Sequence, residues 1–410
     1  MRAIALVVGI VLASIGIGAA VVGGTGLPRT YSASARNIAL VDESCVSSTF
    51  CMAVGGAGTG PVAAAAELWD GTRWSPEAMA GLSGVKYLIL KSISCASPRW
   101  CLALGGAELS AGAFIAVSWR WDGDAWSEPI TVPSAVVRAE GSKPIVLLSN
   151  VACPSERFCL AVGETGAPNQ AFVPFAAALV DGQWMKPAGG FPELLPESVS
   201  CVSASYCVTI GNLPGLAARA GVQVWNGRGW APEQILPGRP IELGAIACTS
   251  RTSCVGLAAN DTQEAVNLVW NGRVWTVARV PSAPANSFLV GISISCPTVH
   301  FCLSVVSDLP DTSLASNPGA SSTVPTFRPF AMDWNGTMWR RAPSLPRGTS
   351  DVTSVSCVGP SYCMAVDSSA LLWNGHTWTV VFHGNPHVFR AAVASASASA
   401  SQSVSAQTGQ

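Results

Sequence analysis

Short apolar runs, bounded by Gly, Pro, Asn or Asp, recur along most of the chain. Residues 291–296 and 159–163, for example, are rich in Val, Ile and small side chains, and such runs are typical of β-strands. They come in groups of four: the first run ends at a Cys, the second begins at a Cys, the third ends at a Trp and the fourth begins at a Trp. Asn-Gly or Asp-Gly stands between the last two runs, and both residues tolerate the positive φ angles of a tight hairpin. The pattern therefore predicts a repeated unit of four antiparallel strands.

The cysteines mark the first hairpin of each unit. All 14 fall into Cys-x5-Cys pairs, spaced about 50 residues apart. Opposed residues in antiparallel strands lie within disulfide range, so we expect one disulfide per hairpin, each contributing about 2 kcal/mol to stability. Metal binding is the disfavoured alternative, because two thiols fill only half of a zinc site and the 4 His are too few for seven such sites. The expected disulfides are Cys45–Cys51, Cys95–Cys101, Cys153–Cys159, Cys201–Cys207, Cys248–Cys254, Cys296–Cys302 and Cys357–Cys363.

Tryptophan marks the second hairpin. A Trp-Asp/Asn-Gly-x-x-Trp motif recurs six times, and the third unit carries a shorter version that ends at Trp184. An aromatic residue also precedes the second Cys in every unit but the fifth, which has Ser253. A residue repeated in nearly every unit serves the scaffold, since a single binding site needs only a few, so we assign these aromatics to packing. The full motifs begin at Trp69, Trp121, Trp225, Trp270, Trp334 and Trp373.

Seven four-stranded units of about 50 residues predict an all-β fold, a seven-bladed β-propeller of four-stranded antiparallel blades with one hairpin disulfide per blade. We expect it to span residues 36–387. The alternative, a string of small disulfide-stapled modules, is weaker because one such unit cannot bury two apolar faces alone. A small residue before each first Cys suits close packing between blades: Ser44, Ser94, Ala152, Ser200, Ala247, Ser295 and Ser356.

The composition agrees with blades that are covered on both faces. Charged residues are 11% of the chain, against about 25% in ordinary globular proteins. The formal net charge of -1 leaves no positive surplus for phosphates, so we expect no nucleic-acid partner. The sequence contains no glycine-rich phosphate loop and no G-x-S-x-G motif, and we expect no cofactor, no metal and no catalytic set.

The two ends of the chain differ from the repeats. Residues 1–35 include an uncharged stretch after Arg2, long enough to span a bilayer, and an Ala33-Ser34-Ala35 cleavage candidate. We therefore expect a signal peptide or an N-terminal membrane anchor, with the rest outside the cytoplasm and membrane contact limited to this segment. Residues 388–410 are rich in Ala and Ser and predict a disordered tail, with a strand as the alternative.

The repeats resemble those of kelch-type propellers, the class that includes the galactose oxidase central domain. The resemblance rests on an apolar strand ending in Gly-Gly, such as 54–56, followed by a Trp-Asp pair and a further Trp, such as 69–74. It covers the seven units loosely, since the double Gly fades in later units and Cys-x5-Cys is not part of the kelch pattern. The hairpin end is also similar to the Asp-box of sialidase-like propellers, without its Ser-x-Asp-x-Gly start. Both likenesses imply the fold and transfer no activity.

Sequence variation is concentrated in the connections that leave the second strand of each unit. The Cys and Trp hairpins are uniform and share one face of the predicted ring, so we expect a ligand, protein or glycan, on the opposite face. This makes the chain a non-enzymatic binding module. The alternative is a secreted carbohydrate-active hydrolase or lyase with acids converging at the channel mouth, and a third possibility is that these charges only keep an apolar protein soluble. The candidate binding residues are Glu164, Asp261, Glu264, Asp308, Asp311 and Arg328.

Overall fold

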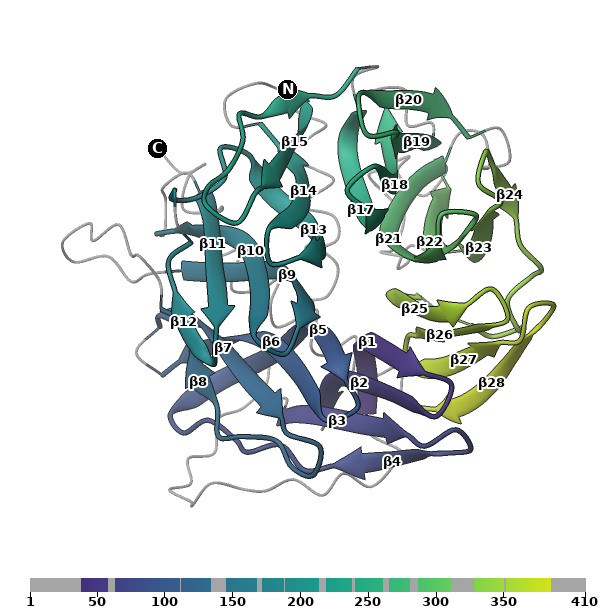
Figure 1. Cartoon of the computed structure of the whole chain (residues 1–410). Helices are drawn as coiled ribbons and strands as arrows, with labels where there is room; N and C mark the ends of the chain where they lie inside the picture. The colour runs from purple at the N-terminus through teal and green to yellow at the C-terminus, as the bar shows by residue number, and fades with distance from the viewer. Residues whose placement is uncertain are drawn as a thin grey trace, which may run out of the picture.

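The computed structural model confirms the predicted seven-bladed β-propeller (Figure 1). Its 28 strands, counted within the described residues, form seven consecutive groups of four, and within each group every strand pairs antiparallel with the next. The structure describes residues 38–57, 63–110, 112–133, 145–167, 172–187, 189–213, 219–237, 240–260, 265–280, 287–310, 328–349 and 352–384.

The strands are assigned to blades in chain order. Blade 1 contains β1 (Ile38–Ser47), β2 (Phe50–Ala57), β3 (Ala63–Trp69) and β4 (Trp74–Glu77). Blade 2 contains β5 (Val85–Ser97), β6 (Trp100–Leu109), β7 (Phe114–Trp121) and β8 (Ile130–Thr131). Blade 3 contains β9 (Ile145–Ser155), β10 (Phe158–Gly166), β11 (Val173–Val180) and β12 (Gln183–Met185). Blade 4 contains β13 (Leu195–Ser203), β14 (Tyr206–Asn212), β15 (Ala220–Trp225) and β16 (Gln234–Ile235).

The remaining blades follow the same plan. Blade 5 contains β17 (Pro240–Ser250), β18 (Ser253–Asn260), β19 (Ala265–Trp270) and β20 (Trp275–Arg279). Blade 6 contains β21 (Ser287–Thr298), β22 (Phe301–Pro310), β23 (Arg328–Trp334) and β24 (Trp339–Arg341). Blade 7 contains β25 (Ser354–Gly359), β26 (Tyr362–Val366), β27 (Ser369–Trp373) and β28 (Trp378–His383).

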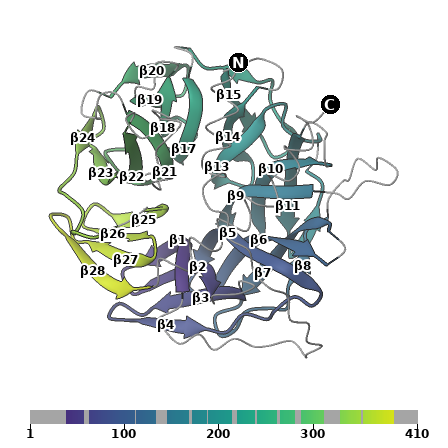
Figure 2. The ribbon, with the colours of Figure 1, turned by 180° about the vertical axis from the view of Figure 1, so that it is seen from behind.

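The first strand of every blade lies on the inside of the ring. Each of these strands contacts the first strand of the next blade, and β25 of blade 7 contacts β1 of blade 1, which closes the ring. Figure 2 shows the same closed arrangement from behind. Blade 7 is built entirely from C-terminal strands and blade 1 entirely from N-terminal ones, so side chains and loops, not a shared sheet, hold the two ends together.

Apolar clusters fill the spaces between neighbouring blades. Leu160 and Val162 of β10 pack with Trp225 of blade 4, while Ala161, on the opposite face of the same strand, packs with Leu102 of blade 2. Both faces of a blade are thus buried, and the strands lack the alternation of polar and apolar residues seen in one-sided sheets. This arrangement explains the low content of charged residues.

The predicted disulfides are all present, and no cysteine of the chain is free. In each pair the Cα atoms lie 3.9 to 4.1 Å apart. In blade 1, Cys45 and Cys51 are direct partners across the hairpin, as are Cys95 and Cys101 in blade 2. Each bridge therefore clips the two inner strands of its own blade.

The Trp hairpins close through a repeated turn. In blade 1, Trp69 and Trp74 are direct partners, and Oδ1 of Asp70 accepts hydrogen bonds from the backbone N–H groups of Thr72 and Arg73 at 2.8 and 2.9 Å. Gly71 between them has φ +96°, a conformation that L side chains rarely adopt. The third blade replaces this loop with a two-residue turn in which Asp181 and Gly182 both have positive φ.

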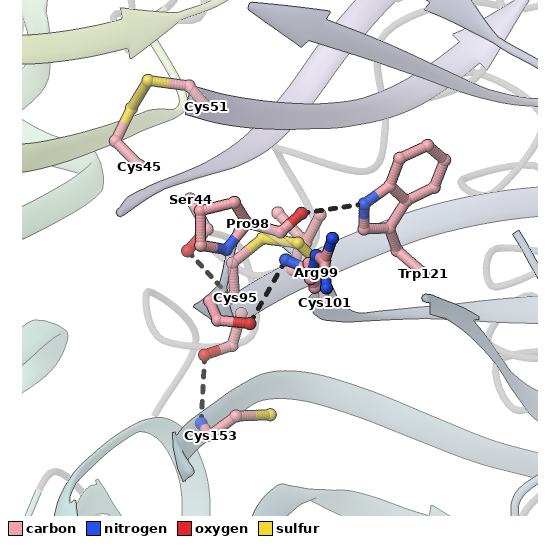
Figure 3. The surroundings of a disulfide bond; sticks show 12 residues. Ser44, Cys45, Cys51, Cys95, Pro98, Arg99, Cys101, Trp121 and Cys153 are labelled. Atoms are coloured by element: carbon pink, nitrogen blue, oxygen red, sulfur yellow. Dashed lines mark hydrogen bonds between the residues drawn. A yellow bond between two sulfur atoms is a disulfide. The ribbon is translucent and has the colours of Figure 1, made fainter. Parts of the chain in front are cut away.

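The two kinds of hairpin pack against each other at one end of the ring. The indole N–H of Trp121 donates to the carbonyl oxygen of Pro98 in the Cys hairpin at 3.2 Å (Figure 3). Gly123 of the Trp hairpin lies directly against Arg99 of the same Cys hairpin. We call this end, formed by all the Cys and Trp hairpin turns, the hairpin face. The opposite end, formed by the connections between second and third strands and between blades, is the loop face.

The small residue before each first Cys has a role beyond its size. The hydroxyl of Ser44 accepts a hydrogen bond from the backbone N–H of Cys95 in the next blade at 2.9 Å (Figure 3). Ser94, Ser200 and Ser295 make the same bond to the following blade, at 2.9 to 3.0 Å. The sequence predicted close packing here, and the structure adds a chain of hydrogen bonds from blade to blade.

Candidate functional site

The loop face holds those predicted binding residues that the structure describes. Glu164 lies near the end of β10, is partly buried, and burial raises the pKa of its carboxyl. Asp308 and Arg328 are backbone register partners in β22 and β23, at the base of the longest connection between a second and a third strand. The structure therefore brings Asp308 and Arg328 together, whereas Glu164 stands in blade 3, away from both. Asp261, Glu264 and Asp311 lie outside the described residues.

A bulge interrupts the innermost strands at an equivalent place, four residues before the first Cys. The register shifts between Leu90 and Ser92 in β5 and between Pro196 and Ser198 in β13, so Lys91 and Glu197 are the extra residues of these bulges. Bulges re-aim a side chain, and they are common next to functional sites. The bulged residues that the register identifies in blades 1 to 5 are Val41, Lys91, Ser149, Glu197 and Gly244.

Lys91 brings a positive charge to the inside of the ring. Its side chain is exposed, yet the surrounding protein lowers the pKa of its ammonium by desolvation. Glu197, on the equivalent bulge of blade 4, accepts a hydrogen bond from Asn212 at 2.5 Å.

Two carboxyl groups are buried where blade 7 meets blade 1. Glu43 of β1 is 4% exposed and Glu67 of β3 is 1% exposed. The register Glu43–Ala53–Glu67 places them on the same face of blade 1, on either side of a small alanine. Ala53 belongs to the apolar cluster that also contains Met364 of blade 7. The other six blades have apolar residues at the position of Glu43: Ile93, Val151, Val199, Ile246, Ile294 and Val355.

Three carboxyl oxygens of these glutamates, both of Glu43 and Oε1 of Glu67, have no hydrogen bond of ordinary geometry within the described residues. The hydroxyl of Ser354 and the backbone N–H of Ser356 lie near enough to Glu43 to lower its pKa, but burial outweighs them. Burial, and secondly the charge of Asp42, raises the pKa of Glu43 well above its usual range. Burial, with a smaller contribution from Glu77, raises the pKa of Glu67 to about 7. Both side chains are therefore held in an environment that favours the neutral acid.

Asp42, next to Glu43 in β1, is partly buried, and its carboxylate is fully hydrogen-bonded. Its carboxylate accepts hydrogen bonds from the backbone N–H of Ile93 in blade 2 at 2.8 Å and from the hydroxyl of Ser354 in blade 7 at 2.6 Å. Burial raises the pKa of Asp42, and these hydrogen bonds oppose the rise. Asp42 thus connects three successive blades, which is a structural role.

These acids are not arranged for chemistry on an external substrate. Glu43 and Glu67 are covered by blade 7, and Asp42 turns its carboxylate to the backbone and to Ser354. Within the described ranges, no group of three or more His, Cys, Asp or Glu residues is placed to hold a metal ion. No helix in this part of the chain is long and apolar enough to cross a membrane. The sequence analysis missed all three acids.

Comparison with known proteins supports the fold. No protein-family model matches the sequence, and no curated protein is significantly similar to it. Among solved structures, YCF48 bound to D1 peptide is similar over 88% of this chain and 96% of that chain, with 10% identity and a TM-score of 0.50. At this identity the likeness shows a β-propeller fold and nothing finer, and the kelch-type resemblance is not confirmed.

Two further solved structures are similar at lower TM-scores. The GH74 xyloglucanase from Xanthomonas campestris has 12% identity and a TM-score of 0.47, and the match covers 88% of this chain but only 56% of the xyloglucanase. The fucose-specific lectin from Aleuria aurantia has 11% identity and a TM-score of 0.39, and the match covers 83% of this chain and 94% of the lectin. Neither adds to the assignment.

Proposed function

We propose that the chain is a non-enzymatic binding propeller that holds a protein or glycan on its loop face. One observation carries this proposal: the hairpin face keeps the same disulfide in every blade and nearly the same turn and indole hydrogen bond, so variation in loop length is left to the loop face. Loops on a rigid scaffold are where binding residues usually lie. Asp308 and Arg328, paired in register at the base of the longest loop, are the residues that we expect to contact the ligand.

The hydrolase alternative has less support. Glycosidases use two carboxyl groups that flank the substrate across an open site. In this chain the carboxyl groups with the most strongly raised pKa, Glu43 and Glu67, are buried between blades. On the loop face, burial raises the pKa of Glu164, and no neighbouring charge contributes to this shift.

The seven disulfides indicate an oxidising, extracytoplasmic environment. Within this proposal, residues 1–35 act as a signal peptide or membrane anchor, residues 36–387 form the propeller, and residues 388–410 are a disordered tail. A kelch-type origin of the repeats also belongs to the proposal and rests on the Gly-Gly and Trp-Asp elements of the first two blades. The structure of YCF48, a protein of similar fold, has a D1 peptide bound.

The test compares the two faces directly. The full chain, exported into an oxidising compartment, is screened against a glycan array and a panel of surface-exposed proteins. We expect the double substitution Asp308→Ala/Arg328→Ala to abolish binding of the ligand found, whereas Arg73→Ala, on the hairpin face, leaves it unchanged. An equal loss of binding in both variants, or the absence of any ligand, would contradict the proposal. Release of reducing ends from a panel of polysaccharides would favour the hydrolase alternative.

A further inference from the structure

The arginines of the hairpin face in blades 1, 3, 4 and 5 fall into two groups. In blade 1 Arg73 lies 3.5 Å from the carboxylate of Asp70, and in blade 3 Arg157 lies 2.6 Å from the carboxylate of Asp181. The corresponding turn residue in blades 4 and 5 is Asn226 or Asn271, which carries no charge. Arg228, Arg251 and Arg273 of blades 4 and 5 have no carboxylate partner among the described residues.

These three arginines, which we call the arginine patch, lie on adjoining turns. The guanidinium of Arg251 donates a hydrogen bond to the hydroxyl of Ser205 at 2.6 Å, and Gly227, the neighbour of Arg228, packs against that serine. On the other side, Gly272 precedes Arg273 and packs against Thr252, the neighbour of Arg251. All three arginine side chains are exposed. The contacts thus connect them in one continuous row across two blades.

An aromatic surface adjoins this row. Trp270 and Trp275 of blade 5 are both partly exposed, whereas both indoles of the corresponding pair are buried in blades 2, 6 and 7. The two rings are tilted by 33° with their centroids 5.4 Å apart. The indole N–H of Trp270 donates to the carbonyl oxygen of Arg251 at 2.9 Å, so the exposed ring edge and the arginine patch belong to one site.

Tyr206 fixes the central arginine. Its hydroxyl donates to the same carbonyl oxygen of Arg251 at 3.0 Å, and the Arg251 guanidinium lies 5.5 Å from the centroid of the Tyr206 ring. A guanidinium held over an aromatic ring loses little further freedom when it pairs with an anion. Arg251 is thus held in a fixed orientation with no carboxylate from its own chain.

We propose that the hairpin face of blades 4 and 5 binds an acidic polysaccharide through the arginine patch and the Trp270–Trp275 pair. Guanidinium groups pair bidentately with carboxylates, which a uronate-containing chain presents at every repeat. The partly exposed indoles suit the apolar face of a sugar ring, because burying C–H surface against an aromatic ring is favourable. An acidic protein would satisfy the arginines but gives no reason for the partly exposed indoles beside them. This site is separate from the proposed function on the loop face.

The experiment measures binding of the full chain to polygalacturonate at about 0.15 M salt, where exposed charges further apart than about 8 Å are screened. The informative variant is Asn226→Asp/Asn271→Asp, which restores the carboxylate of blades 1 and 3. In blade 1 Asp70 makes the turn that Asn makes here, since Oδ1 of Asp70 and Oδ1 of Asn226 both accept from the N–H groups two and three residues on, in blade 4 at 2.9 and 3.0 Å. We expect a loss of affinity of about tenfold or more.

Two further variants complete the comparison. Arg228→Gln/Arg273→Gln is expected to weaken binding as strongly, while Arg73→Gln/Arg157→Gln, which removes the same charge from blades 1 and 3, is expected to change it little. Asp308→Ala/Arg328→Ala, on the loop face, leaves this binding intact even if the proposed function fails. Absence of polygalacturonate binding, or equal affinity of the two arginine variants, overturns the proposal. Equally tight binding of poly-glutamate overturns the glycan assignment in favour of an acidic protein.

Discussion

The hydroxyl of Ser356 accepts a hydrogen bond from the backbone N–H of Cys45 at 2.9 Å, and this contact joins the last blade to the first. The two residues are separated by 311 positions along the chain. The same bond recurs between other neighbouring blades, but here no chain connection supports it. A second contact, from the N–H of Leu40 to the carbonyl oxygen of Asp367 at 3.2 Å, lies close by. Ring closure is therefore supported by identifiable hydrogen bonds as well as by the apolar cluster shared by blades 1 and 7.

Removing the Ser356 hydroxyl should weaken ring closure. We expect Ser356→Ala to lower the free energy of unfolding by about 1 to 3 kcal/mol, because the N–H of Cys45 loses its acceptor in a partly buried place. Equilibrium unfolding in urea, with the disulfides intact, measures the change.

The chain contains its own reciprocal control. Ala152 and Ala247 occupy the equivalent position in blades 3 and 5 and offer no hydroxyl. Ala152→Ser should therefore add a bond to the N–H of Cys201 and raise the free energy of unfolding by about 1 kcal/mol. If both substitutions leave the stability unchanged, the row of interblade hydrogen bonds does not hold the ring together.

The buried glutamates predict an unusual pH dependence. Because the folded state raises the pKa of Glu43 and Glu67, it retains protons that the unfolded state releases, so stability falls as pH rises. For Glu67 the loss should extend from about pH 4.5 to about pH 7, the interval between its ordinary and its folded pKa. The charges nearest to these groups, Asp42 and Glu77, are both acidic and act in the same direction.

Thermal unfolding measured between pH 4 and pH 8 tests this dependence. Glu43→Ile, which copies the residue of blades 2, 5 and 6, should raise the melting temperature at pH 8 more than at pH 4, and Glu67→Gln should flatten the profile between pH 4.5 and 7. A wild-type melting temperature that rises steadily over this interval would show that the two carboxyl groups are solvated or paired.

Each disulfide should contribute locally. Replacing Cys95 and Cys101 together by valine keeps an apolar pair but opens the bridge, and we expect a loss of about 2 kcal/mol, since only a short loop is released. Peptide mapping under non-reducing conditions should show seven bridges of this local kind. Disulfides between blades, or a fall of more than about 5 kcal/mol in the free energy of unfolding for one pair, would contradict the view that each disulfide stabilises only its own blade.

The parts of the fold that the sequence predicted share a physical feature: they are specified by nearby residues. Cys45 with Cys51, and Trp69 with Trp74, meet within one hairpin whose turn is fixed by Asp70 and Gly71, so spacing alone identified them. Because the same hairpin pattern repeats in seven units, a closed ring of blades was the architecture that agreed with the sequence.

The residues that were missed depend on contacts between distant segments. Glu43 and Glu67 are charged residues within strands, and such residues are normally exposed. Their burial comes from blade 7, about 300 residues away along the chain. Lys91 needed the bulge in β5, which no sequence signal marked. On the loop face, Asp308 and Arg328 were expected near each other only as members of one loop, and their register became evident from β22 and β23.

The most direct test of the loop-face proposal is photo-crosslinking from defined positions. A photoreactive phenylalanine derivative is placed at Val173, which is 41% exposed at the start of β11 on the loop face, or at Met338, which is 53% exposed at a Trp hairpin tip of blade 6. Both positions expose a large apolar side chain, so the substitution itself is matched. We predict that the Val173 variant captures a protein or glycan in the compartment to which the chain is exported. The Met338 variant, whose label lies in blade 6 and outside the arginine patch of blades 4 and 5, is predicted to capture none. Capture from Met338 alone, or from neither position, would contradict the assignment of the loop face as the binding surface.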